Sequence, residues 1–150
     1  MGPKAERIVI GQLKPVEMVR LFNEDLCQQH LGIVANSVDL KESTGEIRLQ
    51  PWHMNFEKTV HGGILFSVLD SLMGLAVFPH LKDPERILAI DLKINYVRAA
   101  TLDMEVLQGK ASTVSRTRRL AVAEGEILAP DGTILCKALG TFAILKAGGG

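Results

Sequence analysis

The spacing of apolar and polar positions along the chain changes several times, and each change predicts an element. A helical stripe begins at Pro15, a favoured first residue of a helix, and ends near Leu31-Gly32, where glycine provides the stop. The apolar members of this stripe are Val16, Val19, Leu21, Phe22 and Leu26. Residues 33–40 and 44–50 then alternate loosely around the turn-forming residues 41–45, which predicts a hairpin.

A second helix is predicted by the run from Ile64 to Phe78, in which Asp70 is the only ionisable residue. A helix that is apolar on nearly all sides is normally buried. This run starts after the pair Gly62-Gly63, is too short to span a bilayer, and carries an acid, so we expect a core helix.

The second half of the chain has the pattern of four strands, at 88–97, 102–113, 118–129 and 133–145. The first strand places Leu88, Ile90, Leu92, Ile94 and Tyr96 on one face and Asp91, Lys93 and Asn95 on the other, as in a half-solvated antiparallel strand. Residues 130–132 (Pro-Asp-Gly) form a hairpin signal, and Gly140 predicts a bend or bulge in the last strand.

The element order is therefore α, β, β, α and four β, which predicts an α+β fold with an antiparallel sheet wrapped around one central helix. We expect residues 1–150 to form one domain, with a flexible arm at 1–14 and a flexible tail at 146–150.

The composition of the chain limits the partners and the kinds of site that we expect. Hydrophobic residues make up 47% and charged residues 23% of the 150, and the formal net charge is zero, so we expect neither nucleic acid nor membrane as a partner. Two cysteines and the lack of an apolar stretch behind Met1 favour a cytoplasmic location without a signal peptide. The four histidines lack metal-ligand spacing, and no cofactor is expected.

The glycine pair and Asp70 are the strongest chemical features. The N–H groups at the start of a helix have no intrahelical partner, so Gly62 could polarise a carbonyl group or stabilise an oxyanion. Asp70 lies eight residues later, about 12 Å along the axis, too far for one small reacting group to touch both. If both serve one reaction, the spacing predicts a site between two subunits. The alternatives are a glycine turn needed for packing and an Asp70 hydrogen-bonded within the fold.

A small, polar stripe follows the same helix: Gly63, Ser67, Asp70, Ser71 and Gly74. Such a stripe leaves room for a ligand or a partner helix, or it is only a packing groove. In the preceding loop, Asn55 could bind a carbonyl or orient water, although a loop asparagine is more often a turn residue. His61 could shape the glycine turn by a hydrogen bond.

Basic residues concentrate near predicted strand ends, where Arg98, Arg116 and Arg118 could hold phosphates of a ligand. Lys110 and Arg119 lie in the same stretches. The alternative is solvated strand ends whose charges serve solubility.

Together these residues resemble the hotdog-fold acyl-CoA thioesterases, particularly the phenylacetyl-CoA-type branch of the 4-hydroxybenzoyl-CoA thioesterase superfamily. The likeness covers roughly residues 30–145. It is strongest from Asn55 through His61-Gly62-Gly63 to Asp70, and it continues in Asp91-Leu-Lys-Ile-Asn-Tyr96-Val-Arg98-Ala-Ala. Ala89 departs from a serine of some relatives, and Ala99 departs from the usual proline.

The resemblance implies a homodimer or a homotetramer with active sites between subunits. It implies that the Gly62 N–H polarises the thioester carbonyl and that Asp70 of the partner is nucleophile or general base. It further implies that Asn55 positions water or the leaving thiolate, and that His61 supports the turn. We therefore expect hydrolysis of an acyl-CoA to a carboxylic acid and CoA.

Two rival functions stay open. One is a non-catalytic acyl-CoA-binding hotdog protein, and the other is a hydratase or dehydratase of the same fold, which needs a differently placed histidine. The acyl group is undetermined; Trp52, Phe56, Phe66, Met73 and Phe78 could line its pocket or belong to the core.

Overall fold

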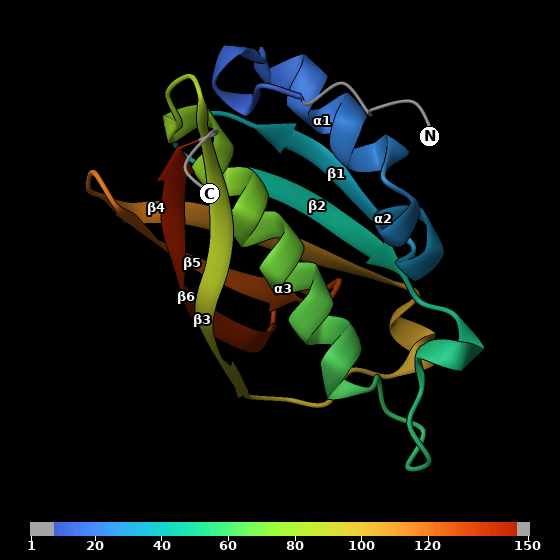
Figure 1. Ribbon diagram of the computed structural model, residues 1–150. Coiled ribbons are helices and arrows are strands. Elements are labelled where there is room, and N and C mark those ends of the chain that lie inside the picture. The colour runs from blue at the N-terminus through green and yellow to red at the C-terminus, as the bar shows by residue number, and fades with distance from the viewer. Residues whose placement is uncertain (1–7, 147–150) are drawn as a thin grey trace, which may run out of the picture.

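A computed structural model describes residues 8–146 and shows one antiparallel sheet curved around a long helix (Figure 1). The helices are α1 (Pro15–Glu24), α2 (Leu26–Leu31) and α3 (Gly62–Val77), with 3₁₀ turns at Ile10–Gln12, Pro51–His53, Phe78–His80 and Leu102–Met104. The strands are β1 (Ile33–Val38), β2 (Ser43–Arg48), β3 (Glu85–Tyr96), β4 (Val106–Arg116), β5 (Leu120–Leu128) and β6 (Ile134–Lys146). Their order is β1-β2-β4-β5-β6-β3, and every pair is antiparallel. The predicted fold class is confirmed.

Helix α3 forms the centre of the core. Together with the turn that follows, Gly62–His80 is long and apolar enough to cross a membrane by length and composition alone. In the fold, however, it packs against β2, β3, β4, β5 and β6, and half of the residues of α3 are buried. The expectation of a core helix is therefore confirmed.

Glycines on the inner face of the sheet allow α3 to approach closely. A Cβ atom at Gly109 would lie 2.5 Å from a methyl group of Leu72, and one at Gly125 would lie 3.0 Å from a methyl group of Leu69. These helix leucines therefore occupy the space that sheet side chains would otherwise take, which produces the close packing of a protein interior.

The first predicted helix is two helices. Asp25 ends α1 and caps α2, because its side chain accepts hydrogen bonds from the backbone N–H groups of Cys27 and Gln28. The segment begins at Pro15 and ends at Leu31 with Gly32 as the C-cap, as predicted. Val16 and Leu26, which the apolar stripe placed inside, are 71% and 80% exposed, so the prediction was wrong for these two positions and for a single continuous helix.

Strand β3 is an edge strand and contains a bulge that the regular alternation did not predict. Ala89 pairs with Phe142 and Asp91 pairs with Thr141, so Ile90 is an extra residue between them. The bulge reverses the facing pattern, leaving Leu88 and Ile90 exposed. Expecting one apolar face along the whole strand was therefore wrong.

Gly140 remains in register opposite Leu92 and Ala123, so no bulge lies at this glycine. The last strand has its irregularity at Leu135, between the pairs Ile127–Cys136 and Leu128–Ile134. A Cβ at Gly140 would lie 3.3 Å from side-chain atoms of Leu92 and Met73. This glycine thus makes room for packing.

Residues 8–14 are placed against the body of the protein rather than forming a free arm. Ile10 and Leu13 pack against the core, and the Gln12 side chain donates a hydrogen bond of 2.6 Å to Asp83. The remaining parts of the predicted arm and tail, 1–7 and 147–150, lie outside the described residues.

Candidate active site

The start of α3 presents a backbone N–H group toward solvent. His61 is the N-cap, and its Nδ1 accepts a hydrogen bond of 3.0 Å from the Gly63 N–H, so the Nε2 carries the ring proton. The Gly62 N–H has no hydrogen-bond partner within residues 8–146. It therefore lies free at the positive end of the helix dipole.

Tyr96, at the end of β3, fixes the position of this helix start. Its hydroxyl donates a hydrogen bond of 2.8 Å to the Gly62 carbonyl oxygen. A Cβ at position 62 would lie 3.0 Å from that hydroxyl and 3.1 Å from the ring Cζ, so glycine fits without displacing the ring. From the sequence, Tyr96 was predicted as a strand residue and belonged to the stretch 91–100 that resembles the thioesterase family. Its contact with Gly62, 34 residues away, required the fold.

A groove of about 310 Å³ lies beside the helix start. Gly62, Tyr96 and Arg98 line it, together with Thr59, Val60, Leu65, Val97, Ala99 and Ala100. Arg98 is thus brought next to Gly62, as a phosphate-binding residue near the site would need to be.

Asp70 faces a different space, an apolar cavity of about 420 Å³. The carboxylate is half-buried, and desolvation raises its pKa above the ordinary value of 3.8. No described residue forms a hydrogen bond or ion pair with it, so the alternative of an Asp70 satisfied within the fold is not seen in residues 8–146. An unpaired, partly desolvated acid in an apolar cavity is a typical functional group.

The walls of this cavity come from α1, α3, β3, β6 and the segment before α1. The lining residues are Ile8, Ile10, Leu13, Met18, Leu21, Phe22, Asp25, Gln28, Asp70, Ser71, Gly74, Leu75, Phe78, Ile87, Ala89 and Phe142. Of the five side chains proposed for an acyl pocket, Phe78 lines it. Met73 is fully buried in the core, whereas Trp52, Phe56 and Phe66 are exposed.

The small, polar stripe of α3 divides into two parts. Ser67 donates a hydrogen bond of 2.8 Å to the Gly63 carbonyl oxygen and so stabilises the first turn. Ser71 and Gly74 lie with Asp70 on the cavity. The stripe is therefore not one continuous ligand surface in the described chain.

Asn55 organises its own loop. Its Oδ1 accepts hydrogen bonds from the backbone N–H groups of Glu57 and Thr59, and its Nδ2 donates to the Thr59 hydroxyl over 2.9 Å. These contacts match the turn-forming alternative. The structure brings Asn55 near neither Asp70 nor the cavity lining.

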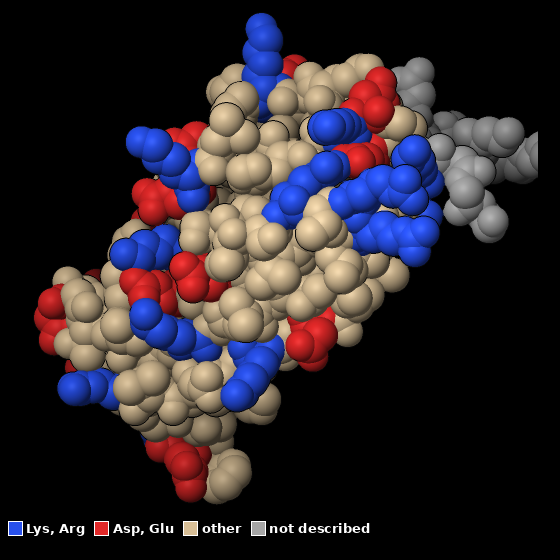
Figure 2. Space-filling view, turned by 90° about the vertical axis from the view of Figure 1, so that its left-hand side faces the viewer, with Lys and Arg blue, Asp and Glu red and all other residues tan. Residues whose placement is uncertain are grey.

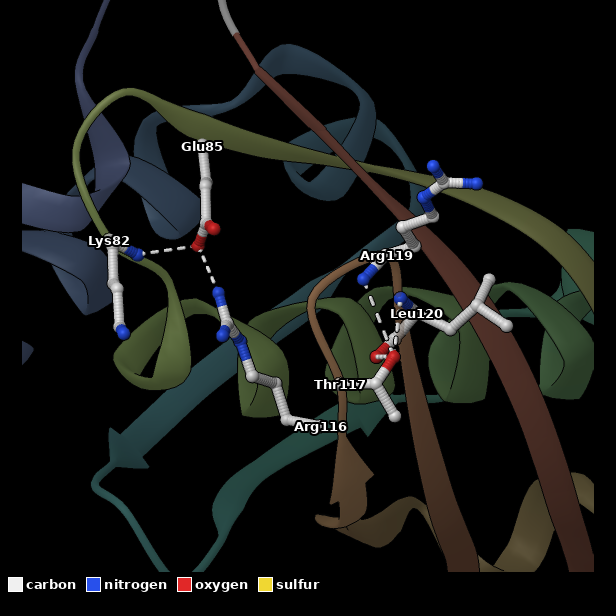
Figure 3. Close-up of polar contacts among 6 residues, drawn as sticks. All are labelled: Lys82, Glu85, Arg116, Thr117, Arg119 and Leu120. Atoms are coloured by element: carbon white, nitrogen blue, oxygen red, sulfur yellow. Dashed lines mark hydrogen bonds and ion pairs between the residues drawn. The ribbon is translucent and has the colours of Figure 1, made fainter.

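The predicted phosphate-binding arginines are separated. Arg116 forms a short ion pair with Glu85, which also accepts a hydrogen bond from the Lys82 N–H over 2.8 Å (Figure 3). Burial disfavours ionised Glu85, but these donors hold the pKa of its carboxyl below the ordinary value. Arg116 is thus engaged within the fold and lies at the opposite end of β3 from Tyr96, about 35 Å away at strand rise.

Arg118 and Arg119 are exposed in the β4–β5 turn, where the Thr117 hydroxyl accepts hydrogen bonds from the Arg119 and Leu120 N–H groups (Figure 3). Figure 2 shows Lys and Arg side chains gathered toward one end of the sheet face. Lys110 forms an ion pair of 2.9 Å with Glu126.

His53 was among the histidines considered as metal ligands. It is buried, with its Nδ1 accepting a hydrogen bond from the Gln50 N–H and its Nε2 within 3.1 Å of the Leu31 carbonyl oxygen. Desolvation lowers its pKa, which favours the neutral ring. The described part of the chain contains no group of three or more His, Cys, Asp or Glu residues placed to hold a metal ion.

A single chain thus keeps its two candidate reactive groups apart. The free N–H of Gly62 and the carboxylate of Asp70 lie on one helix, eight residues apart, or about 12 Å along its axis. The tertiary structure cannot shorten this distance, because both residues belong to the same rigid element.

The antiparallel sheet wrapped around one central helix is the hotdog fold. The family model described as the thioesterase superfamily matches residues 57–136, just over half of the chain, and the chain belongs to this family. Membership supports thioester hydrolysis as the general activity. A protein of Halobacterium salinarum, named as a candidate esterase, is 36% identical over 100 residues, which are 61% of this chain. The match spans 64% of that relative's length, less than two thirds of it.

Solved structures show the same architecture. A conserved protein of Pseudomonas aeruginosa superposes with a TM-score of 0.75 at 27% identity, over 84% of this chain and 98% of its own. A thioesterase of Haemophilus influenzae superposes with a TM-score of 0.81 at 15% identity, over 93% of this chain and 96% of its own. A phenylacetic acid degradation-related protein of Ralstonia eutropha, described as a candidate thioesterase, superposes with a TM-score of 0.75 at 23% identity. The superposition covers 84% of this chain and 98% of its own. The last two similarities establish the fold alone.

Proposed function

We propose that the protein is an acyl-CoA thioesterase that works as a homodimer. The Gly62 N–H of one subunit polarises the thioester carbonyl, and Asp70 of the other supplies the base or nucleophile. The observation that carries the proposal is the unpaired, desolvated Asp70 carboxylate at the wall of an apolar cavity, in a chain of the thioesterase superfamily.

The raised pKa of Asp70 favours the role of general base over direct attack. In that role the carboxylate takes a proton from water while the water oxygen bonds to the thioester carbon. The carbonyl oxygen gains negative charge, which the Gly62 N–H stabilises without reorganisation. Collapse of the intermediate breaks the C–S bond, and the departing CoA thiolate takes up a proton. Direct attack would instead form a mixed anhydride that water then hydrolyses.

Strand β3 supports the dimer. It is twelve residues long and bears exposed Leu88, Ile90 and Tyr96, and within residues 8–146 it pairs only with β6. A long edge with free backbone groups and apolar side chains readily pairs with another strand. We propose that β3 pairs with β3 of a second copy, which would continue the sheet and bring two α3 helices side by side. Two such dimers would form the tetramer expected from the resemblance.

The supporting residues have more limited roles in this proposal. His61 caps α3, Ser67 stabilises its first turn, and Gly63 donates to His61, so all three hold the Gly62 N–H in place. Asn55 shapes the preceding loop.

Arg98 and Arg118 are the arginines that we propose for the CoA phosphates, whereas Arg116 is already paired with Glu85. Because Arg98 and Arg118 lie near opposite ends of β3 in one chain, the two would act on one CoA from different subunits. Replacing either with alanine should raise KM for an acyl-CoA several-fold and leave KM for the same acyl-pantetheine unchanged, because the latter lacks the nucleotide phosphates. Equal effects on both substrates would remove these residues from the proposal. We also propose a cytoplasmic enzyme, consistent with free thiols at Cys27 and Cys136.

Steady-state thiol release by Asp70→Asn and Asp70→Ala proteins that remain folded tests the assignment. We expect each to lose most of the activity, because neither side chain can accept a proton from water or attack carbon. Turnover close to wild type in either variant would contradict the proposal.

Mixing two inactive variants tests the shared site. In a heterodimer of Asp70→Ala with Gly62→Pro subunits, one site has an intact Gly62 and an intact Asp70, while the other has neither. Random exchange should restore about a quarter of the wild-type activity, since half of the dimers carry one intact site of two. Failure to complement after verified exchange would place the site within one chain.

The rival function is acyl-CoA binding without hydrolysis. The free Gly62 N–H favours catalysis, because polarising a thioester carbonyl contributes to reaction rather than to affinity alone. Thiol release from an acyl-CoA panel would support the enzyme, and tight binding without release would support the rival. Phenylacetyl-CoA belongs in that panel, because the resemblance favours the phenylacetyl-CoA-type branch.

A further inference from the structure

Gly74 stands in the last turn of α3, one turn after Asp70. Glycine inside a helix is less stable than alanine. Packing does not require it, because the nearest neighbours of a Cβ at this position would be Ile87 Cδ1 at 3.8 Å and Phe142 Cε1 at 3.9 Å, both ordinary contacts. Gly109 and Gly125 differ, since a Cβ there would collide with leucines of α3.

The space that a side chain at position 74 would take belongs to the Asp70 cavity. Gly74, Asp70 and Ser71 form its α3 wall, and its volume of about 420 Å³ lies within the range of ligand pockets. A methyl group at Gly74 would therefore enter this cavity rather than the packed core.

On the basis of the proposed function, we propose that Gly74 is a specificity-determining residue: it keeps open the part of the cavity that receives the acyl hydrocarbon and sets the longest acyl group accepted. A thioester held at Asp70 has its acyl group beside this cavity. Gly74 lies one helical turn from Asp70 in the same wall, facing Ile87 and Phe142, so an acyl chain that extends from Asp70 along α3 would pass it.

The chemistry of the walls defines the class of acyl group. Most of the lining is hydrocarbon, including Met18, Leu21, Phe22 and Leu75. Its charged residues are two acids, Asp25 and Asp70, and the described lining contains no lysine, arginine or histidine. A carboxylate at the far end of the acyl group would be repelled, so neutral medium-chain acyl groups fit and dicarboxylic acyl groups are rejected.

The test is kcat/KM for butyryl-, octanoyl- and tetradecanoyl-CoA, with succinyl-CoA as the charged substrate, for wild type, Gly74→Ala and Gly74→Val. We expect the ratio of the octanoyl to the butyryl value to fall about tenfold in Gly74→Ala and further in Gly74→Val, because each added carbon shortens the cavity. An unchanged ratio would overturn the proposal, and so would efficient hydrolysis of succinyl-CoA by the wild type.

Gly125→Ala is the matched control, because its methyl group would project from the sheet and lie 3.0 Å from Leu69 of α3. It therefore crowds α3 without entering the cavity. We expect a lower Tm without a change in chain-length ratio. Gly74→Ala should keep or raise the wild-type Tm. An equal ratio change in both variants would mean that general repacking, rather than the cavity, determines the preference.

Binding of S-hexyl-, S-octyl- and S-decyl-CoA thioethers, which cannot be hydrolysed, separates this inference from the proposed function. Affinity should increase with chain length in wild type and stop increasing at a shorter chain in Gly74→Ala. This result in a protein that releases no thiol would leave the cavity assignment standing and remove the thioesterase. If Gly74→Ala instead changes the oligomeric state and leaves chain preference unaltered, the glycine serves packing between copies and the inference is wrong.

Discussion

The hydroxyl of Tyr96 donates a hydrogen bond to the carbonyl oxygen of Gly62 over 2.8 Å, while its ring occupies the space that a side chain at position 62 would need. The last residue of β3 therefore fixes the first residue of α3. Because β3 is the edge strand proposed to pair with a second copy, the same contact links that proposed interface to the free N–H of Gly62.

Tyr96→Phe should show how much the Tyr96 hydroxyl contributes to catalysis by positioning Gly62 and how much it contributes to the free energy of unfolding. Removing the hydroxyl leaves the Gly62 carbonyl to water, and we expect a loss of about 1 kcal/mol in unfolding free energy. We expect kcat to fall several-fold with little change in KM, because the helix start is less well fixed in the transition state. Denaturant unfolding and steady-state kinetics measure both. A change in KM alone would indicate a ligand contact instead of a positioning role.

The Gly62 N–H can be removed with little change to the helix. Proline is favoured at the first position of a helix, and His61 already has ψ 132°, the extended conformation that a residue before proline adopts. We expect Gly62→Pro to lower kcat about a hundredfold to a thousandfold, as for a lost oxyanion donor.

Gly62→Ala is the control for that variant. It adds the same Cβ against the Tyr96 ring but keeps the N–H, so we expect a clearly smaller loss of kcat. Circular dichroism would verify that both variants keep the helix. Equal activities of the alanine and proline variants would show that the N–H does not take part.

The pH dependence of kcat/KM should report the ionisation of Asp70. Burial raises the pKa of this carboxyl, so the acid limb should have its midpoint above the ordinary value of 3.8. Activity falls below that midpoint because the protonated acid cannot accept a proton from water. A midpoint at or below 3.8 would mean that another group controls the limb.

Asp70→Asn should stabilise the fold near neutral pH. A folded-state pKa above the unfolded value means that the carboxyl favours the fold when protonated, and that this contribution is lost as the pH rises through the folded pKa. The uncharged amide avoids this loss. We expect a higher Tm than wild type at pH 7 and a smaller difference below the ordinary carboxyl pKa. A lower Tm at pH 7 would reveal a favourable partner for the carboxylate.

Glu85→Gln should weaken the end of the sheet without affecting substrate binding. The ion pair with Arg116 and the hydrogen bond from Lys82 favour the ionised carboxylate, so we expect a loss of about 1–2 kcal/mol at pH 7. The pKa of Glu85 is lowered, so its contribution exists above the ordinary value of 4.5 and disappears as the pH falls through the folded value. Urea unfolding at pH 7 and pH 3 would measure the change. An unchanged stability together with a raised KM would instead make Arg116 a substrate residue.

Local patterns predicted some features and missed others for identifiable reasons. The alternation in 88–97 predicted a strand, but Ile90 bulges because β6 offers one residue fewer opposite it. The stripe from Val16 to Leu26 predicted one helix, but Asp25 caps a second helix. Arg116 and Arg118 are two residues apart in the chain, yet Glu85 engages Arg116 alone.

The sequence by itself determined the central apolar helix, its glycine start and the 12 Å separation of Gly62 and Asp70, because these depend on periodicity and helix rise within one element. The tertiary structure alone decided that Tyr96 fixes Gly62 and that Asp70 and Gly74 open onto one apolar cavity. Each of these relationships joins segments distant in the chain, or depends on space left empty, and neither leaves a local pattern of residues.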